Sequence, residues 1–438
     1  MDFFAGLAPF VQVGIAIAIF LVFVFHGVPI GVSFAIAGFV GLVGVRGFDV
    51  ALYTLGTMPY RWAAAAALIP MPLFILMGFL AFYSGISRDL FEAAFRWMGR
   101  LPGGLAAAST LANAAFGAVC GSAQAAAATM SPIAFPEMEK RGYDRRLSTG
   151  SLAAGATLSF LIPPSIPLIL YGVFAQVSIS KLFIAGIIPG LLLAGLSIVT
   201  ILIMCMRNPQ LGPVGPPFTW REKLTSLKGV WGMLLLFFLV IGSLYAGVCT
   251  PSEAGAIGAF GAFAIGLAMR RLKFSGMIAA AKDTARIVCF VMTIIIGSWV
   301  FNTYLGVSGF TTVFEEWMLG LPVSPYAILA FVVVIYIIIG MFLDVAAIIL
   351  LTIPTIAPIM ANLGFDLVWF GVLLVLLQCI GFISPPIGLN AFIVQGVTGV
   401  PSEEVFRGSI PFIIAALVCI VLIIVFPEIC LFLPNMMK

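Results

Sequence analysis

Charged side chains and histidine are scarce in this chain. Only 9% of the 438 residues are charged, and His26 is the single histidine. Soluble globular proteins carry about 25% charged residues, so the composition excludes an ordinary water-soluble domain. One histidine cannot build a multi-histidine site, and we expect no transition-metal centre. We interpret His26 as a polar residue at the end of an apolar run.

Enzyme and nucleotide-binding motifs are missing as well. The chain holds no HExxH, GxSxG, Walker or dinucleotide-binding pattern. It therefore cannot by itself couple ATP hydrolysis to transport, and we expect no enzyme activity, no organic cofactor and no nucleic-acid partner. The seven cysteines form no pair motif, so we interpret them as small apolar packing residues.

Apolar residues dominate what is present. They make up 62% of the chain and fall in runs long enough for helices that cross a lipid bilayer. The sequence therefore predicts an all-α polytopic membrane protein, whose first run is a retained span rather than a signal peptide. The predicted spans lie near residues 8–26, 30–45, 66–84, 149–177, 182–206, 229–248, 252–269, 284–305, 368–397 and 410–433.

Two halves of the chain resemble each other. Four prolines in the first half have a proline 222 positions later: Pro132 and Pro354, Pro136 and Pro358, Pro163 and Pro385, Pro164 and Pro386. Only 27 residues are proline, so we infer an internal duplication, which is common in secondary transporters. We predict a first repeat over 1–206, a cytoplasmic linker over 207–228 and a second repeat over 229–438.

The distribution of basic residues predicts that the repeats have opposite orientations. Arginine and lysine flank the apolar region 103–138, whereas the matching region 325–361 is flanked by Glu315, Glu316 and Asp366. Cytoplasmic loops are rich in Lys and Arg, so the first region is entered from the cytoplasm and the second from the other side. We expect both termini outside the cytoplasm.

Polar and small residues interrupt these two regions, which predicts re-entrant helical hairpins. Their tips are expected near Gly121, Ser122 and Gln124, and near Gly340 and Asp344. Each hairpin is followed by a span that a proline pair breaks, 149–177 at "TLSFLIPPSIP" and 368–397 at "GFISPPIGLN". Broken helices leave backbone carbonyl and N–H groups free, so we expect a substrate and ion site where tips and breaks converge.

Asp344 is the sharpest candidate in this site. No other charge lies between Glu316 and Asp366. An acid at the centre of a span costs about 2.5–3.5 kcal/mol, so it needs a partner. We expect a sodium ion, with a proton or a helix-capping role as the alternatives. Serine hydroxyls and amides nearby either contact ligands or serve helix packing: Ser122, Ser159, Ser165, Ser384, Gln124, Gln378 and Asn390.

Several stretches resemble the large membrane subunit of tripartite ATP-independent periplasmic (TRAP) transporters. They are "HGVPIGVSFA", "GSAQAAAATMSPIAFPEMEKRGYD", "FLIPPSIPLILYGV", "SISKLFIAGIIPGLLL", "TPSEAGAIGA" and "SPPIGLNAFIV". The resemblance implies a sodium-driven importer of organic acids in the bacterial inner membrane, working as an elevator-type transporter. It also implies two partners, a small four-helix membrane subunit and a soluble periplasmic substrate-binding protein.

The same resemblance implies two sodium sites, one at each tip. The first would be formed by Gly121, Ser122, Ser159, Pro163 and Pro164. The second would be formed by Asp344, Gly381, Ser384 and Pro385. The predicted substrate contacts are Gln124, Ser165, Pro386, Gly388 and Asn390. The chain departs from the family pattern at two positions, with Ala123 in place of a second tip serine and Ser159 where many members have glycine.

Other functions remain open at the level of sequence. A stand-alone organic-anion transporter of similar fold, coupled to sodium or protons, is the main alternative. A channel or a membrane-embedded enzyme is the third, although the sequence offers only one buried acid. Which organic acid is carried is not encoded in any motif of this chain.

Overall fold

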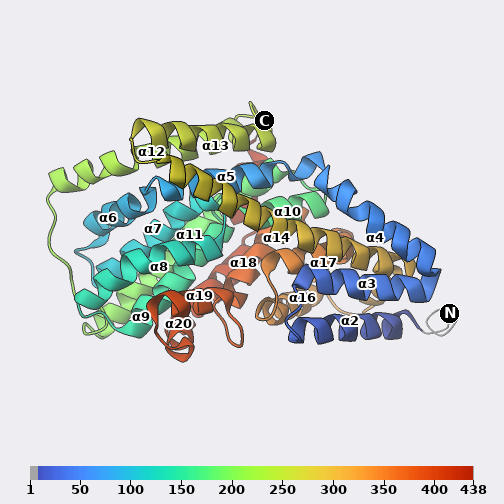
Figure 1. Ribbon diagram of the computed structural model, residues 1–438. Coiled ribbons are helices and arrows are strands. Elements are labelled where there is room, and N and C mark those ends of the chain that lie inside the picture. Colours follow the sequence, from blue (N-terminus) through green and yellow to red (C-terminus); the bar gives the residue numbers. More distant parts are fainter. Residues whose placement is uncertain (1–7, 438) are drawn as a thin grey trace.

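The computed structural model describes residues 8–437, which form helices and no strand (Figure 1). Within this range seven helices are long and apolar enough to cross a membrane, and several shorter apolar helices accompany them. The seven are Ala66–Tyr83, Ile179–Arg207, Trp220–Tyr245, Pro251–Ala268, Phe274–Val307, Val345–Asn362 and Ser402–Val425. The multi-pass helical architecture predicted from composition is therefore confirmed.

One group of helices combines the beginnings of both halves. It contains α2 (Pro9–Phe25), α3 (Ile30–Arg46), α4 (Phe48–Ala63), η1 (Ala66–Leu68), α5 (Pro70–Tyr83), α12 (Trp220–Tyr245), α13 (Pro251–Ala268) and α14 (Phe274–Val307). Helix α3 packs on α14, and α5 packs on α13. Glycine makes the first contact close: a Cβ on Gly31 would lie 2.4 Å from the Thr293 carbonyl oxygen. Small residues at such crossings let helices associate through close backbone packing.

A second group contains two helical hairpins. Helices α7 (Gly104–Cys120) and α8 (Ala123–Lys140) form the first, and α16 (Pro325–Gly340) and α17 (Val345–Asn362) form the second. The helices of each hairpin are separated by a few residues at the predicted tips. Figure 1 shows α7 and α8 side by side. Within each hairpin the two helices contact each other. Short connecting helices, α6 (Ile86–Met98) and α15 (Phe310–Leu319), precede the hairpins.

A broken helix follows each hairpin. The first consists of α9 (Arg145–Thr157), η2 (Leu158–Phe160) and α10 (Ile166–Phe174), and the second of α18 (Leu367–Gly381) and α19 (Leu389–Thr398). Both breaks contain a proline pair, and the Pro163–Pro164 and Pro385–Pro386 peptide bonds are cis. The helices restart after Ser165, whose side chain caps α10, and after Gly388, which has a positive φ of 51°.

The remaining helices differ in detail from the sequence-based expectation. Helix α11 (Ile179–Arg207) contacts α20 (Ser402–Val425) and α21 (Glu428–Asn435). The last two were predicted as one span over 410–433, but Pro427 separates them because proline obstructs the preceding helical turn. Helix α12 begins at Trp220, inside the predicted linker 207–228. Helix α4 had not been predicted at all.

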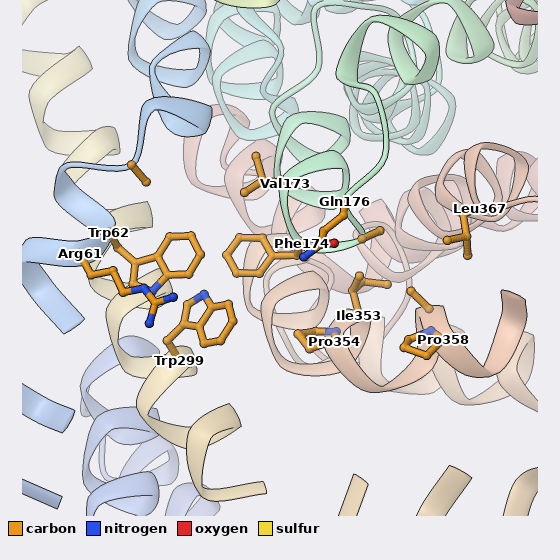
Figure 2. Close-up of a pocket in the computed structure, with 13 residues that line it drawn as sticks. Arg61, Trp62, Val173, Phe174, Gln176, Trp299, Ile353, Pro354, Pro358 and Leu367 are labelled. Atoms are coloured by element: carbon orange, nitrogen blue, oxygen red, sulfur yellow. The ribbon is translucent and has the colours of Figure 1, made fainter. Parts of the chain in front are cut away.

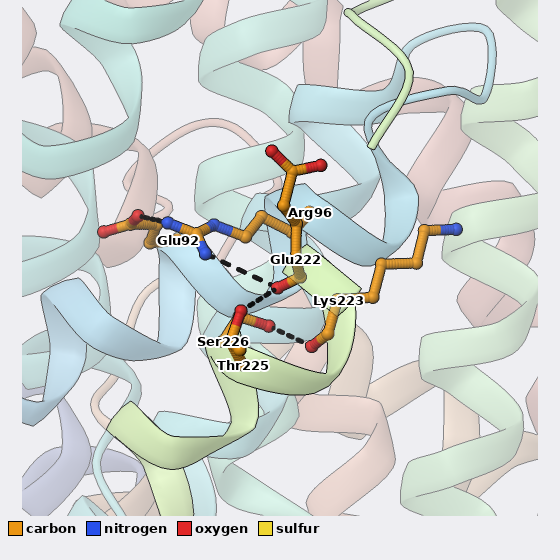
Figure 3. A network of polar contacts seen from close by, with 6 residues as sticks. All are labelled: Glu92, Arg96, Glu222, Lys223, Thr225 and Ser226. Carbon is orange, nitrogen blue, oxygen red and sulfur yellow. Dashed lines mark hydrogen bonds and ion pairs between the residues drawn. The ribbon is translucent and has the colours of Figure 1, made fainter. Parts of the chain in front are cut away.

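The start of α12 is fixed by capping and by contacts with α6. Thr219 and Glu222 form a capping box, which satisfies backbone N–H groups of the first turn. Figure 3 shows Arg96 of α6 paired with Glu92 and donating to the Glu222 carbonyl oxygen at 3.4 Å. One of these stabilising features is a local cap, and the other comes from an arginine far away in the sequence. Neither is visible as an apolar run, so the charged stretch 207–228 is predicted as a linker.

Candidate functional site

The tips of the two hairpins are joined by a chain of hydrogen bonds. Ser122 Oγ donates to Gln124 Oε1 at 3.1 Å, and Gln124 Nε2 donates to Asp344 Oδ2 at 2.9 Å. The other carboxylate oxygen, Asp344 Oδ1, accepts from the Ala346 N–H at 2.9 Å and so caps α17. Ser122 caps α8 in the same way. Residues 220 positions apart therefore share one polar network.

The first tip packs directly on the first helix break. Gly121 has a positive φ of 61°, and its carbonyl oxygen accepts from the Ile166 N–H at 3.3 Å. A Cβ on Gly121 would lie 2.5 Å from the Pro164 carbonyl oxygen, and one on Gly117 would lie 2.5 Å from Ser159 Oγ. Glycine is required at both positions, since a side chain would push tip and break apart.

The second tip packs on the second break through two glycines. A Cβ on Gly381 would lie 2.4 Å from the Gly340 carbonyl oxygen, and one on Gly340 would lie 2.9 Å from Gln378 Oε1. Ser384 Oγ donates to the Ile380 carbonyl oxygen at 2.8 Å, inside its own helix end. The first tip thus lies against the break between η2 and α10, and the second lies against the end of α18, next to its break.

A cavity of about 180 Å³ lies at the junction of the tips, the first break and α14. Its polar side chains are Ser122, Gln124 and Asp344, and Asp344 is the only charged one. The Asp344 side chain is buried, with 6% of its residue surface exposed, and it forms no ion pair with another residue in 8–437. A carboxylate with carbonyl and hydroxyl oxygens nearby is chemically suited to a hard cation.

The predicted site residues fall into two sets. Gly121, Ser122, Gln124 and Asp344 line the cavity. The other predicted site residues do not line the cavity. Buried Ser159, Pro163, Pro164, Ser165, Gly381, Ser384 and Gly388 belong to the breaks, whereas Pro385 and Pro386 are exposed. Asn390 is buried and bridges helices, since its Nδ2 donates to the Ala153 carbonyl oxygen at 3.2 Å.

Three residues near the first tip were not predicted. A second cavity, of about 390 Å³, shares Ser122 and Gln124 with the first and is also lined by Asp283 and Arg286 of α14. Tyr83 Oη donates to Asp283 Oδ2 at 2.6 Å, and Arg286 lies 3.7 Å from Asp283 Oδ1. A sequence signal was present, because Asp283 and Arg286 lie at the start of the predicted apolar span 284–305.

Residues that are equivalent by the 222-residue shift touch each other between the two breaks. The rings of Phe160 and Phe382 have centroids 4.8 Å apart. Cys379 Sγ donates to the Thr157 carbonyl oxygen at 3.5 Å. In a two-fold arrangement only residues at the axis contact their own equivalents, so these pairs are typical of an axis between the breaks.

Comparison with known proteins identifies relatives over nearly the whole chain. Residues 17–429 match the family model described as "Tripartite ATP-independent periplasmic transporter, DctM component". The C4-dicarboxylate TRAP transporter large permease protein DctM of Pseudomonas aeruginosa is 34% identical over 370 residues, which cover 84% of this chain and 86% of that protein. The sialic acid TRAP transporter large permease protein SiaM of Vibrio cholerae is 29% identical, covering 94% of this chain and 96% of that protein.

A solved structure supports the same overall fold. The Alcanivorax borkumensis YdaH transporter matches with a TM-score of 0.62, covering 90% of this chain and 89% of that chain. Its sequence identity is 15%, so the likeness concerns the fold alone.

Proposed function

This chain belongs to the tripartite ATP-independent periplasmic (TRAP) transporters as their DctM component, the large permease subunit, and we propose that it imports a small organic acid together with sodium. The family consists of transport permeases rather than enzymes. We propose three features of its function: coupling to sodium, a carboxylate substrate and a relative movement of the helices.

The buried carboxylate of Asp344 carries the proposal of a cation site. It lies at a hairpin tip, receives hydrogen bonds from Gln124 and from a backbone N–H, and has no basic partner in the described chain. An unpaired acid within the membrane is costly and marks an ion pathway. Sodium bound by Asp344 and nearby oxygens would neutralise this charge, and it would bind most favourably when both tips are closed around it.

The arrangement of the helices supports two inverted repeats. Helices α8 and α17 begin at Ala123 and Val345, and α9 and α18 begin at Arg145 and Leu367, each pair 222 residues apart. The packing is reciprocal, because α10 contacts α17 and α19 contacts α8. In our proposal the hairpins and broken helices move as one body against α2–α5 and α12–α14, with both termini on the periplasmic side.

The names of the relatives support an organic acid as the proposed substrate. Two of the matched relatives are named for C4-dicarboxylates and for sialic acid, which both carry carboxylates, and a third is named for isethionate, which is a sulfonate. We propose that a periplasmic binding protein delivers such an acid and that a small four-helix subunit accompanies the chain. Purification from its native membrane should then yield a complex, whereas a stand-alone transporter would be isolated and would transport by itself.

Substitution of Asp344 tests the cation role. In proteoliposomes supplied with the partner proteins, Asp344→Ala should lower sodium-dependent uptake at least about 100-fold, since the loss of a buried ion ligand removes the coupled ion. Asp366→Ala is the matched control, because Asp366 is an exposed helix-capping carboxylate of the same half. Uptake by Asp344→Ala with the sodium dependence of the parent protein would exclude the proposed role. If a proton gradient drives uptake by the parent protein as well as a sodium gradient does, the proton alternative would be favoured.

A further inference from the structure

A cavity with aromatic walls lies away from the hairpin tips. It measures about 540 Å³ and is enclosed between the end of α4 and α14 on one side and α10, α17 and the start of α18 on the other. Figure 2 shows Trp62 and Trp299 facing Phe174, with Pro354 and Pro358 of α17 forming the opposite wall. The cavity thus lies between the two groups of helices that we propose to move against each other.

Three aromatic rings form a continuous wall of this cavity. The ring centroids of Trp62 and Trp299 are 4.8 Å apart, and those of Trp62 and Phe174 are 5.2 Å apart. Both indole Nε1 atoms are buried, and neither has a hydrogen-bond acceptor among residues 8–437. Buried Trp N–H groups usually find a partner, and these two would gain one if the rings shifted enough to open them to a ligand in the cavity.

The charge of the lining is positive and uncompensated. Arg61 is the only charged residue that lines the cavity, and it makes no ion pair or hydrogen bond within the described chain. Gln176 adds an amide, and no carboxylate lines the walls. In Figure 2 Arg61 and both indole rings are drawn on the same side of the cavity, opposite Pro354 and Pro358.

We propose that this cavity is a second binding site, specific for a small organic anion. The carboxylate of the ligand would pair with Arg61, whose planar fork matches a carboxylate, and would accept from the indole N–H groups. Phe174, Pro354 and the other apolar walls would cover its hydrocarbon part. The choice of an organic acid as ligand rests on the proposed function, but the charge and the donors of the site do not.

The location gives this second site a role in the path of the substrate. Pro354 and Pro358 belong to α17, the helix that Asp344 caps, while Arg61 and Trp62 belong to α4 of the other group. An anion in the cavity therefore contacts both groups of helices, separately from the cation site. It would be held there before it reaches the hairpin tips.

Equilibrium binding of radiolabelled anions tests the inference. The full chain is placed in nanodiscs without anionic lipid, in sodium-free buffer, and titrated with radiolabelled succinate and sialic acid. At least one anion should bind, and Arg61→Gln should raise its Kd at least about tenfold. Trp299→Phe, which removes the N–H and replaces the indole by a smaller aromatic ring, should raise it about threefold to tenfold. Arg46→Gln, which changes an exposed and unpaired arginine outside the cavity, should leave Kd unchanged.

The outcomes separate this site from the proposed transport function. Binding that persists in Asp344→Ala and is lost in Arg61→Gln would support a distinct anion site even if uptake proved independent of sodium. No binding of either anion to the parent protein would overturn the inference, and so would equal loss in Arg46→Gln, which would indicate general surface charge. A Kd unchanged in Arg61→Gln would also overturn it while leaving the proposed sodium coupling intact.

Discussion

At the scale of single residues, the link between Gln124 and Asp344 decides how the hairpin tips meet. Gln124 accepts from Ser122 through its oxygen and donates to Asp344 through its nitrogen, so one amide serves both tips. A hydrogen bond to a charged group contributes about 1.5–3 kcal/mol, and a buried acceptor that loses its donor pays a desolvation penalty. The tip-to-tip contact is therefore both a structural and an electrostatic element.

Gln124→Glu tests the electrostatic part. A second carboxylate would face Asp344 within hydrogen-bond distance, and two like charges so close disfavour each other's ionised forms. We expect a lower melting temperature in choline chloride and a larger stabilisation by sodium chloride than in the parent protein, because a bound cation relieves the repulsion. Melting curves in the two salts measure this. Equal effects of sodium and choline would argue against a sodium ion between the tips.

At the scale of elements, close contact between a tip and a break depends on glycine. Gly121 ends α7 with a left-handed backbone, and its missing Cβ leaves room for the Pro164 carbonyl group. Gly142, at the end of α8, is also left-handed with a φ of 74°, but nothing lies within 4 Å of its Cβ position. A comparison of Gly121 with Gly142 therefore separates the effect of the left-handed backbone from the effect of close packing.

Alanine at these two glycines should have different consequences. Gly142→Ala should lower stability by about 1–2 kcal/mol, the cost of a left-handed non-glycine residue, with uptake preserved. Gly121→Ala adds a clash with backbone that cannot move aside, so we expect a larger drop in melting temperature and loss of uptake. Thermal unfolding and transport assays on both variants are the measurement. Similar uptake by both variants would mean that the tip does not need to lie against the break.

At the scale of the whole molecule, the helices form two groups, which we propose to be related by a pseudo-two-fold axis. Pairs such as α3 with α14 and α5 with α13 hold one group together, and the hairpins and breaks form the other. The groups also contact each other, and one of these contacts is a hydrogen bond from Asn302 Nδ2 on α14 to the Leu350 carbonyl oxygen on α17, at 2.7 Å. Relative motion of the groups must break such contacts.

Cross-linking across the two groups tests this motion. In a cysteine-free background, the pair Asn302→Cys and Leu350→Cys should bind mercury and stop uptake, because it ties α14 to α17. Uptake should return when a thiol reductant removes the mercury. The pair Phe20→Cys and Phe34→Cys is the control, since these rings lie 4.3 Å apart within one group. Full uptake by the first pair after complete cross-linking would contradict an elevator-type motion.

The sequence by itself determined most of the apolar helices and their interruptions, because these depend on local chemistry; the duplication stays a prediction from the proline spacing. Apolar runs specify spans, and proline pairs break helices wherever they occur. It also placed Ser122 and Asp344 near the two hairpin tips, where the structure has them. Tertiary structure alone decided which distant side chains meet. Gln124 reaches Asp344 across 220 positions, and Arg61, Trp62 and Trp299 converge from two helices. No periodicity encodes such contacts, since they arise only when separate helices pack.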